Sequence, residues 1–273
     1  AAGSNASASG RLCLPSTRDQ RVLLVEVPFT AHDIGSLETS VGLWEHVWPC
    51  HRGPAQGEPA PARPDLVLGF NGNLSEAVHE RLRGRLAALT ARRVITECFG
   101  AVSIESAYLS GVDDTYDKRR LDANWTLGPN NLFFHFLQTS VDRGYRYMTQ
   151  LEPDVLPLRP LWLEQLHCLA AASSAWVLGS AFLARCAHDV QTRRCAELGD
   201  EIKYHLNGNA LYATRDRAFQ AYWAHAFSGA LLRWPFDLSL HMYARSLPSA
   251  AQRRLAPKFR AHPFILNFGG EPL

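Results

Sequence analysis

Residues 145–158, YRYMTQLEPDVLPL, combine an apolar run with two carboxylates that a single proline separates. Residues 145–151 have the length and composition of a buried β-strand, and residues 155–158 return to apolar chain. Glu152 and Asp154 therefore lie between two buried stretches, where acidic side chains line a cleft more often than a free surface. A solvated turn after a strand is the plainer alternative.

Apolar runs and helical patterns alternate along the first half of the chain. Residues 21–29, 65–71 and 93–99 are expected to be buried strands, and the residues between them carry apolar side chains at helical spacing. Ser75 is expected to cap the second helix, and Pro129 to open the helix before residue 145. Strands that are apolar on both faces and alternate with helices predict a Rossmann-like α/β fold, with a mostly parallel sheet and helices on both faces.

The second half of the chain is less regular. We expect a helix near Trp162, strands at residues 176–180 and 205–213, a helix capped by Thr214, and a last helical stretch at residues 237–243. Neither an internal repeat nor a clear linker is visible, so we expect one domain over residues 21–273 after a flexible tail of residues 1–20. Parallel α/β sheets bind ligands at the carboxyl ends of their strands, and Glu152 and Asp154 follow such an end.

Charge and composition argue against several classes of protein. The net charge is only +2 and the basic residues are scattered, which argues against nucleic acid as a partner. No run of about 18 apolar residues is present, so membrane contact is expected only through an anchor absent from this chain. The sequence also lacks the GxGxxG pattern of dinucleotide folds and the GxxxxGKS/T pattern of P-loops.

Six cysteines and three N-x-S/T sequons indicate a secretory compartment. None of the cysteines forms a CxxC or CxxH pair, which argues against a zinc site. An even number permits up to three disulfides, and Cys186 with Cys195 could close a short loop. With the sequons at Asn5, Asn73 and Asn124, the cysteines favour the Golgi or endoplasmic reticulum lumen, or secretion, over a cytosolic protein with six buried thiols.

Glu152-Pro153-Asp154 has the chemistry of a metal–diphosphate site. A hard cation such as Mn²⁺ or Mg²⁺ takes oxygen ligands, and a diphosphate supplies several, so one or two protein carboxylates suffice. The cation then neutralises charge on the departing diphosphate. A rival acidic run at residues 113–117 is followed directly by three basic residues, and we expect a solvated or gating loop there. His32 and Asp33, after the first strand, could also face the cleft.

The Glu-Pro-Asp segment resembles the DxD-type motif of GT-A fold glycosyltransferases. Its surroundings resemble a group of eukaryotic, largely algal, glycosyltransferase-like sequences, and the matching segments keep their order along residues 21–273. These segments are residues 128–131 (GPNN), 152–154 (EPD) with Val155 and Pro157, 162–163 (WL), 176–180 (WVLGS) and 205–212 (HLNGNALY). The order of the segments is more specific than any one of them.

The resemblance implies a Mn²⁺-dependent (or Mg²⁺-dependent) hexosyl- or pentosyltransferase. Such an enzyme moves a sugar from a nucleotide donor, often a UDP-sugar, to a hydroxyl of a protein or glycan acceptor. Residues of about 21–158 would form the nucleotide-binding half, and residues of about 159–273 the acceptor half. Asp154 would bind the metal directly, and Glu152 would reach the metal through water or hold the donor ribose.

The resemblance also assigns residues to the donor. Pro28 and Phe29 end the first strand and are expected to meet the nucleoside. Asn71 follows the second strand and is expected to reach the base or ribose. Asn130 and Asn131, in the matching GPNN segment, are further candidates for donor binding.

A third metal ligand is expected near the C-terminus. Glycogenin-like members carry a His-Phe-x-Gly pattern there, whereas residues 267–270 of this chain are NFGG, with Asn267 where the histidine would be. The amide oxygen of Asn267 suits a hard cation, and His262 is the nearest histidine. A histidine that binds nothing is the plainer interpretation of His262.

The remaining candidates lie in the second half of the chain. Asn207, Gly208 and Asn209 resemble the strand beneath the donor sugar, where amides bind hydroxyls and glycine admits the sugar; a plain bulge is the alternative. Asp237 is the candidate base that deprotonates the acceptor. An enzyme that retains the anomeric configuration would instead use Asp237 on the donor sugar, and the sequence leaves both open.

Two other functions are compatible with parts of the pattern. A sugar-1-phosphate nucleotidyltransferase would share the strand order and the metal, but residues 28–32 (PFTAH) lack the glycine-rich basic loop usual in that class. A non-catalytic carbohydrate-binding protein on a transferase-like fold would present exposed tryptophans to sugar rings. Most of the seven tryptophans fall at the helical spacing of a core instead.

Overall fold

The computed structural model describes residues 21–52, 62–116, 126–181, 205–228 and 234–262. Within them, seven strands form one sheet in the order β3-β2-β1-β4-β6-β5-β7. Strand β6 runs antiparallel to both of its neighbours, and every other neighbouring pair is parallel. The strands are β1 (Leu23–Phe29), β2 (Asp65–Phe70), β3 (Val102–Ser106), β4 (Tyr147–Gln150), β5 (Val177–Ala181), β6 (Leu206–Tyr212) and β7 (Phe259–Ala261).

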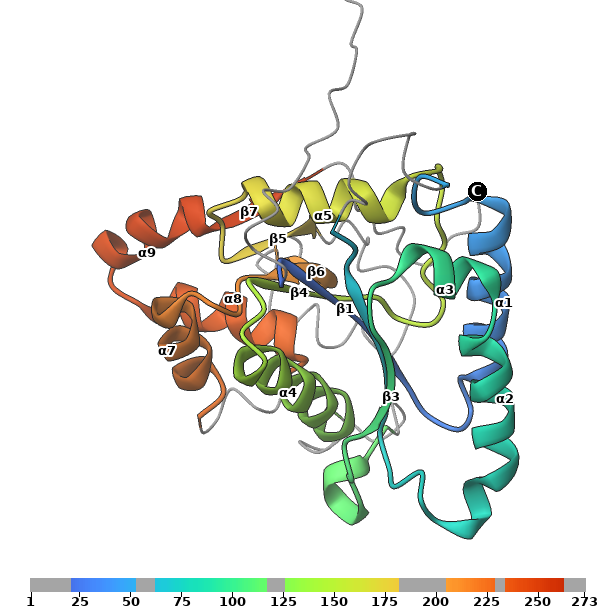
Figure 1. Cartoon of the computed structure of the whole chain (residues 1–273). Helices are drawn as coiled ribbons and strands as arrows, with labels where there is room; N and C mark the ends of the chain where they lie inside the picture. Colours follow the sequence, from blue (N-terminus) through green and yellow to red (C-terminus); the bar gives the residue numbers. More distant parts are fainter. Residues whose placement is uncertain (1–20, 53–61, 117–125, 182–204, 229–233, 263–273) are drawn as a thin grey trace, which may run out of the picture.

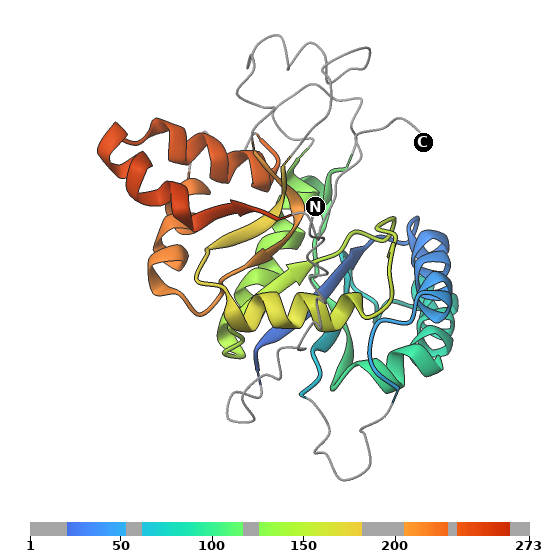
Figure 2. The same ribbon diagram turned by 90° about the horizontal axis from the view of Figure 1, so that it is seen from above.

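Helices surround this sheet, so the prediction of an α/β fold with a mostly parallel sheet is confirmed. Figures 1 and 2 show α4 and α5 on opposite faces of the sheet, α1, α2 and α3 grouped at one side, and α7, α8 and α9 at the other. Their bounds are α1 (Ile34–His46), α2 (Glu80–Thr90), α3 (Arg93–Cys98), α4 (Leu127–Asp142), α5 (Trp162–Ala172), α7 (Arg217–Ala226), α8 (Phe236–Ser246) and α9 (Ser249–Leu255). Short 3₁₀ turns are η1 (Ala77–His79), η2 (Gly111–Asp114) and η5 (Ala256–Lys258).

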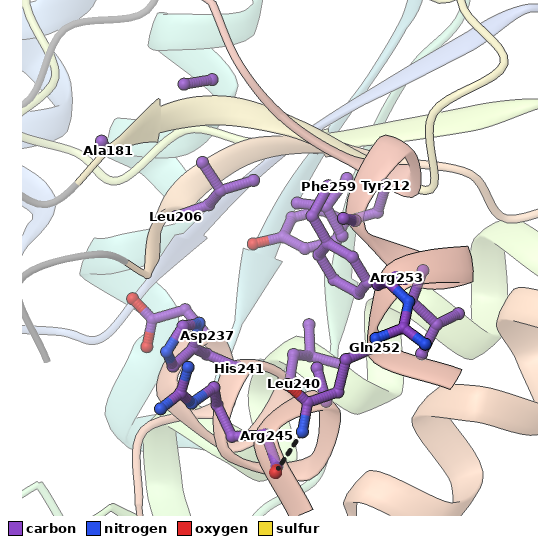
Figure 3. A pocket seen from close by; sticks show the side chains of 15 residues that line it. Ala181, Leu206, Tyr212, Asp237, Leu240, His241, Arg245, Gln252, Arg253 and Phe259 are labelled. Carbon is purple, nitrogen blue, oxygen red and sulfur yellow. Dashed lines mark hydrogen bonds between the residues drawn. The ribbon is translucent and has the colours of Figure 1, made fainter. Parts of the chain in front are cut away.

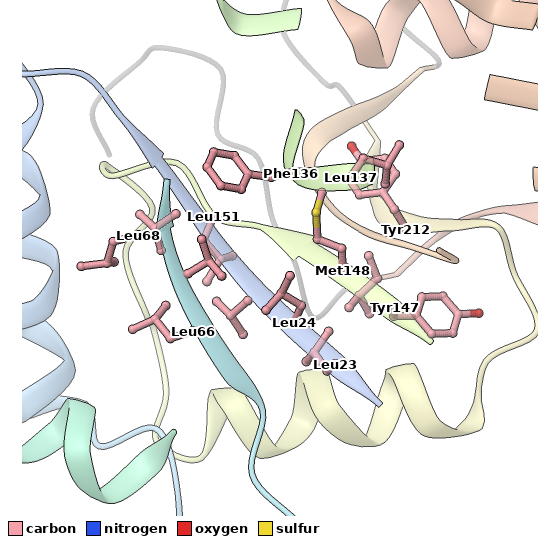
Figure 4. Packing of buried hydrophobic residues seen from close by; sticks show 14 of the residues in the cluster. Leu23, Leu24, Leu66, Leu68, Phe136, Leu137, Tyr147, Met148, Leu151 and Tyr212 are labelled. Carbon is pink, nitrogen blue, oxygen red and sulfur yellow. The ribbon is translucent and has the colours of Figure 1, made fainter. Parts of the chain in front are cut away.

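The core follows from the central place of β1 between β2 and β4. Leu24 and Val25 have no exposed surface although they point to opposite faces of the sheet. Leu66, Leu68 and Met148 from the neighbouring strands pack with them (Figure 4). Because both faces of these strands are covered, their sequences are continuous apolar runs rather than alternating ones.

The prediction of a strand at residues 93–99 is wrong, because these residues form α3 (Arg93–Cys98). Val94, Ile95 and Cys98 share one buried helical face, a spacing that a short apolar run also fits. The third strand is β3, at the edge of the sheet, and most of its residues are only partly buried. An edge strand of this kind lacks the continuous apolar signal by which the other strands are found.

Two predicted helix caps are also wrong. Helix α2 begins at Glu80 after the turn η1, and the Ser75 hydroxyl donates to Oδ1 of Asn73 at 2.7 Å instead of capping it. Thr214 is buried and its hydroxyl donates to the carbonyl of Tyr145 at 2.8 Å. Asp216 caps α7, since its Oδ1 accepts from the first amides of that helix. Pro129 lies in the first turn of α4 as its third residue.

A disulfide joins Cys50 to Cys98 and ties the chain after α1 to the end of α3, with a Cα–Cα distance of 5.5 Å. The sequence left the pairing of the cysteines open. Cys186 and Cys195, the pair considered for a short loop, lie outside the described residues. Of the helices that the structure describes, none has the length and apolar character needed to cross a membrane.

Candidate functional site

A cavity of about 470 Å³ opens at the carboxyl edge of the parallel strands, where the fold predicts a ligand site. The end of β1, the start of α1, the turn after β4 and the first turns of α4 and α8 surround it. Its lining residues are Pro28, Phe29, Thr30, His32, Asp33, Ser36, Tyr116, Pro129, Leu132, Gln150, Glu152, Pro153, Asp154 and Phe236. The strand ends β1 and β4, which are neighbours in the sheet, therefore meet the Glu-Pro-Asp segment in one cavity.

The Glu-Pro-Asp turn is fixed by hydrogen bonds from two sides. The amide of Val155 donates to the carbonyl of Glu152 at 2.9 Å and closes the turn. Ser40, buried on α1, donates its hydroxyl to the carbonyl of Pro153 at 2.5 Å. Since Pro153 also has a restricted backbone, the carboxylates of Glu152 and Asp154 are carried on a rigid support while both residues stay exposed.

Asn209 on β6 holds Glu152 through both its backbone and its side chain. The Glu152 amide donates to Oδ1 of Asn209 at 2.8 Å, and Nδ2 of Asn209 donates to Oε2 of Glu152 at 2.9 Å. The same Nδ2 donates to Oδ1 of Asn207 at 3.2 Å. The side-chain amide of Asn209 uses both its oxygen and its nitrogen in these hydrogen bonds. Asn209 therefore orients Glu152 at the edge of the cavity.

A third carboxylate of the cavity, Asp33, lies directly before α1. Oδ2 of Asp33 accepts hydrogen bonds from both the amide and the hydroxyl of Thr30, each at 2.8 Å. These contacts close the turn between β1 and α1, so Asp33 serves the loop rather than the helix amides. Asp33 and Thr30 both line the cavity, as the sequence allowed for Asp33.

Glu26 and Gln150 are buried polar residues that face each other in the register of β1 and β4. Neither oxygen of the Glu26 carboxyl has a hydrogen-bond partner among the described residues, and the same holds for Oε1 of Gln150. Burial, and to a smaller extent the nearby Glu152 carboxylate, raise the pKa of Glu26 well above its usual range. The raised pKa favours the protonated form of Glu26, which pairs in register with Gln150 of the cavity lining.

Tyr116 adds an aromatic side chain from the acidic run that the sequence assigned to a solvated or gating loop. It lines the cavity, and burial together with the Asp114 carboxylate raises the pKa of its hydroxyl. The hydroxyl of Tyr116 consequently keeps its proton at neutral pH. Sequence reasoning missed this residue, and the only signal for it is an aromatic side chain inside a polar acidic segment.

The structure brings four of the predicted site residues into this cavity, namely Pro28, Phe29, Glu152 and Asp154. The three asparagines predicted at the donor are not among its lining residues. Nδ2 of Asn71 donates to Oδ1 of Asp114 at 2.7 Å, and Nδ2 of Asn131 donates to the carbonyl of Asp113 at 3.1 Å. Asn130 is fully buried, and its Nδ2 donates to the carbonyl of Trp234 at 2.8 Å.

The predicted residues of the second half lie around, rather than in, this cavity. Gly208 approaches Phe236 so closely that an added Cβ would lie 2.7 Å from Cζ of that ring, and the ring of Phe236 lines the cavity. Asp237 follows Phe236 and lines a separate cavity, where its Oδ2 lies 3.5 Å from Nε2 of His205. The backbone of Gly208 thus meets an aromatic ring of this chain.

Of the two predicted metal ligands near the C-terminus, His262 lies within the described residues and Asn267 does not. His262 follows β7, which is three strand spacings from β4, roughly 14 Å at the usual separation of strands. Among the described residues no group of three His, Cys, Asp or Glu side chains could hold a metal ion, so His262 does not join Asp154 and Glu152 there. Asn267 lies outside the described residues.

The donor set nevertheless fits a hard cation that shares its ligands with a phosphate. Glu152 and Asp154 offer carboxylate oxygens on a fixed turn, and both carboxylates lie at the cavity. With only these two acidic side chains at the turn, water and diphosphate oxygens would have to complete the coordination. This arrangement differs from a closed structural metal site, which fills its coordination with protein ligands.

No protein-family model matches the sequence, and no curated protein does either. Solved structures do match. The glucosyl-3-phosphoglycerate synthase of Mycobacterium tuberculosis, in complex with UDP, superposes with a TM-score of 0.50 at 11% identity, over 93% of this chain and 74% of that one. The chain has the fold of GT-A glycosyltransferases.

Other matches are weaker in superposition. Mouse xyloside xylosyltransferase 1 in its apo form gives a TM-score of 0.48 at 11% identity, over 88% of this chain and 84% of that one. A mannosyltransferase from Pyrobaculum calidifontis, in complex with GDP-Man and Mn²⁺, gives 0.40 at 12% identity, over 90% and 55%. At 11% identity, the likeness to the glucosyl-3-phosphoglycerate synthase establishes the fold alone, and the chemistry has to be argued from the residues of the cavity.

Proposed function

We propose that this chain is a metal-dependent glycosyltransferase that moves a sugar from a nucleotide-sugar donor, a UDP-sugar, to a hydroxyl of a protein or glycan acceptor. The observation that carries this proposal is the cavity at the carboxyl edge of the sheet, which gathers Glu152 and Asp154 with the end of β1. In an α/β fold this edge is where ligands bind. The Glu-Pro-Asp turn is then this chain's form of the DxD motif.

Asp154 and Glu152 are proposed to have different roles at the diphosphate end of the cavity. Asp154 would hold Mn²⁺ or Mg²⁺ directly, and Glu152, which Asn209 orients, would hold it through water or would bind the donor ribose. The bound cation supplies charge neutralisation for the departing diphosphate. The buried Ser40–Pro153 hydrogen bond keeps both carboxylates in place before the donor arrives.

The nucleoside end is assigned to the strand ends of β1 and β2. Pro28, which is partly exposed, and the buried Phe29 line the cavity at the end of β1, and Tyr116 adds a neutral phenol to the same cavity. Asn71 follows β2 and contacts Asp114, so a role in binding the base or ribose requires it to exchange that partner. Asn130 and Asn131 act indirectly, by anchoring the segments around the first turn of α4.

Asp237 is proposed as the carboxylate that acts on the acceptor hydroxyl or on the donor sugar. It lies beside Phe236 at the start of α8, next to the donor cavity. Asn207 and Gly208 lie on β6, where Gly208 approaches the ring of Phe236, and are proposed to face the sugar. The transferred sugar is a hexose or a pentose, and both stereochemical outcomes fit this placement.

The compartment we propose is the Golgi or endoplasmic reticulum lumen, or the outside of the cell. The Cys50–Cys98 disulfide supports an oxidising environment. The sequon asparagine Asn73 lies in a turn between β2 and α2 and is partly exposed. Glycan attachment at Asn73, visible as a mass shift after expression in a secretory system, would support this location.

A thermal-shift screen of nucleotide sugars, with and without Mn²⁺, tests the proposal. A ligand that binds only the folded state raises the melting temperature by an amount that grows with its concentration. We expect a UDP-sugar to do so only with Mn²⁺, and Asp154→Asn to abolish the shift. A matched control is Asp142→Asn, which changes an exposed carboxylate at the far end of α4. The absence of any metal-dependent shift for all nucleotide sugars would contradict the proposal.

A further inference from the structure

A second cavity, of about 520 Å³, lies between the sheet edge at β5 and β7 and the helices α8 and α9. Its walls are mainly apolar, and Figure 3 shows Leu206, Leu240, Tyr212 and Phe259 turned toward it. Tyr212 is buried, and its hydroxyl donates to the carbonyl of Gly208 at 2.7 Å, so this residue presents its ring rather than a polar group. A ligand of this cavity therefore needs an apolar surface.

Polar and charged side chains lie at its border. Asp237, His241 and Arg245 follow one another at intervals of four residues on α8 and so share one face of the helix. Figure 3 shows these three on one side of the cavity, and Arg253 of α9 on the other side beside Phe259. The cavity thus has a carboxylate at one end and guanidinium groups elsewhere on its rim.

The segment that builds this rim is strongly basic. Residues 234–262 contain five Lys or Arg side chains and one acidic side chain, Asp237, whereas the whole chain has a net charge of only +2. Such an excess of one sign around a concave apolar surface raises the local concentration of oppositely charged ligands. The charge pattern therefore favours an anionic ligand.

Consecutive residues at the start of α8 line the two cavities. Phe236 lines the donor cavity, and Asp237, the next residue, lines the second one. A hydroxyl bound at Asp237 would consequently lie near the donor sugar, with the rest of its molecule extending toward Arg253.

We infer that the second cavity binds the acceptor, and that the acceptor joins an apolar group to an anionic group, a carboxylate or a phosphate. This inference rests on the proposed function. The apolar group packs against Leu240 and Phe259, and the anion pairs with Arg253, while the reacting hydroxyl points to Asp237. A guanidinium group matches both anions because its planar N–H donors bind two oxygens at once.

Titrations with matched charged and neutral probes test this inference. Phenyl β-glucuronide and phenyl β-glucoside differ only at C6, where a carboxylate replaces a hydroxymethyl group. Octyl phosphate and octyl glucoside compare a lipid-like phosphate with a neutral head group. We expect one charged probe to bind the full chain about tenfold more tightly than its neutral match, the usual value of one charge-assisted contact. The charged probe that binds identifies the source of the anion.

Arg253 and its neighbour Arg254 give a matched pair of variants, because only Arg253 lines the cavity. Arg253→Gln should remove the preference for the charged probe, and Arg254→Gln should keep it. Equal losses in both variants, equal affinity for charged and neutral probes, or no binding at all would overturn the inference.

Binding of UDP with Mn²⁺ separates this inference from the proposed function. Arg253→Gln should bind UDP as the wild type does, and Asp154→Asn should lose UDP but keep the charged probe. Charge-selective probe binding in a wild type that never binds UDP would support the anion site and contradict the glycosyltransferase proposal. UDP binding without a preference for charged probes would support the glycosyltransferase proposal and contradict the anion site.

Discussion

Glu26 places a carboxyl group in the middle of the central strand, with no exposed surface and no hydrogen-bond partner among the described residues. Burial raises the pKa of Glu26, so the folded chain holds a proton on Glu26 that the unfolded chain releases above about pH 4.5. Folding then takes up a proton, and the free energy of unfolding falls as pH rises between the unfolded and the folded pKa.

Glu26→Gln tests this placement, because glutamine keeps the shape and cannot ionise. We expect the unfolding free energy of the variant, relative to the wild type, to rise by up to about 1.4 kcal/mol per pH unit above pH 5. Urea unfolding at pH 5, 6, 7 and 8 measures it.

Glu38 provides the control, because the hydrogen bond from Arg85 lowers the pKa of Glu38. This carboxylate is ionised in both states above pH 5, so Glu38→Gln should differ from the wild type by an amount that does not change with pH. A flat pH dependence for Glu26→Gln as well would mean that Glu26 is ionised in the folded protein.

At the level of single residues, the sequence predicts the side chains whose positions depend on the end of a neighbouring apolar strand. Glu152 and Asp154 follow an apolar run, and the structure puts both at the predicted edge of the sheet. Gln150 is a polar residue inside a strand, and Tyr116 is an aromatic residue inside an acidic loop. Both were missed because the residues that surround them in the cavity come from distant segments of the chain. The partner of Glu152, Asn209, is separated from it by 57 residues.

The contact between β6 and α8 depends on Gly208. An added Cβ there would lie 2.7 Å from Cζ of Phe236, and the ring of Phe236 stacks on Phe133 with centroids 3.8 Å apart. Because Phe133 holds this ring from the other side, the ring has little room to move away.

Gly208→Ala should therefore destabilise the protein by about 1–3 kcal/mol, the usual range for overpacking a core. It should also weaken donor binding, since Phe236 lines the donor cavity. Chemical unfolding and UDP titration measure the two effects.

Gly84→Ala is the matched control, because nothing lies within 4 Å of an added Cβ at this position of α2. This variant should gain roughly 1 kcal/mol, as alanine favours a helix over glycine. If Gly208→Ala were as stable as the wild type, the close contact with Phe236 would be absent in solution.

At the level of elements, central strands were predictable and the edge was not. Residues 21–29 and 65–71 lie in the middle of the sheet, where both faces impose apolar side chains on β1 and β2. Strand β3 has no second neighbour among the strands that the structure describes, and its buried and exposed residues alternate too weakly for the strand to be found from the sequence. The apolar run at residues 93–99 became α3 because Val94, Ile95 and Cys98 bury one helical face.

At the level of the whole molecule, the Cys50–Cys98 disulfide joins two parts of the chain that are 48 residues apart. A cross-link of this span reduces the conformational freedom of the unfolded chain, which in the chain-entropy description stabilises the fold by about 4 kcal/mol. Measured values are often smaller.

Cys50→Ala with Cys98→Ala should lower the free energy of unfolding by about 2–4 kcal/mol. Each single variant should lose nearly as much as the double variant, because either one removes the bond. Losses that simply add would indicate that packing at the two sites, rather than the cross-link, carries the stability. Guanidinium unfolding of the four proteins measures this.

Binding of a metal–diphosphate unit in the cavity at Glu152-Pro153-Asp154 is measured most directly by calorimetric titration with UDP. The wild type should bind UDP with Mn²⁺ and lose about 10–100-fold in affinity in EDTA, the range typical for loss of a metal ligand or its support. Asp154→Asn should bind with Mn²⁺ only as weakly as the wild type does in EDTA, and Asp142→Asn should match the wild type. Equal affinity for UDP in Asp154→Asn and the wild type, or no effect of EDTA, would contradict a metal–diphosphate site at this turn.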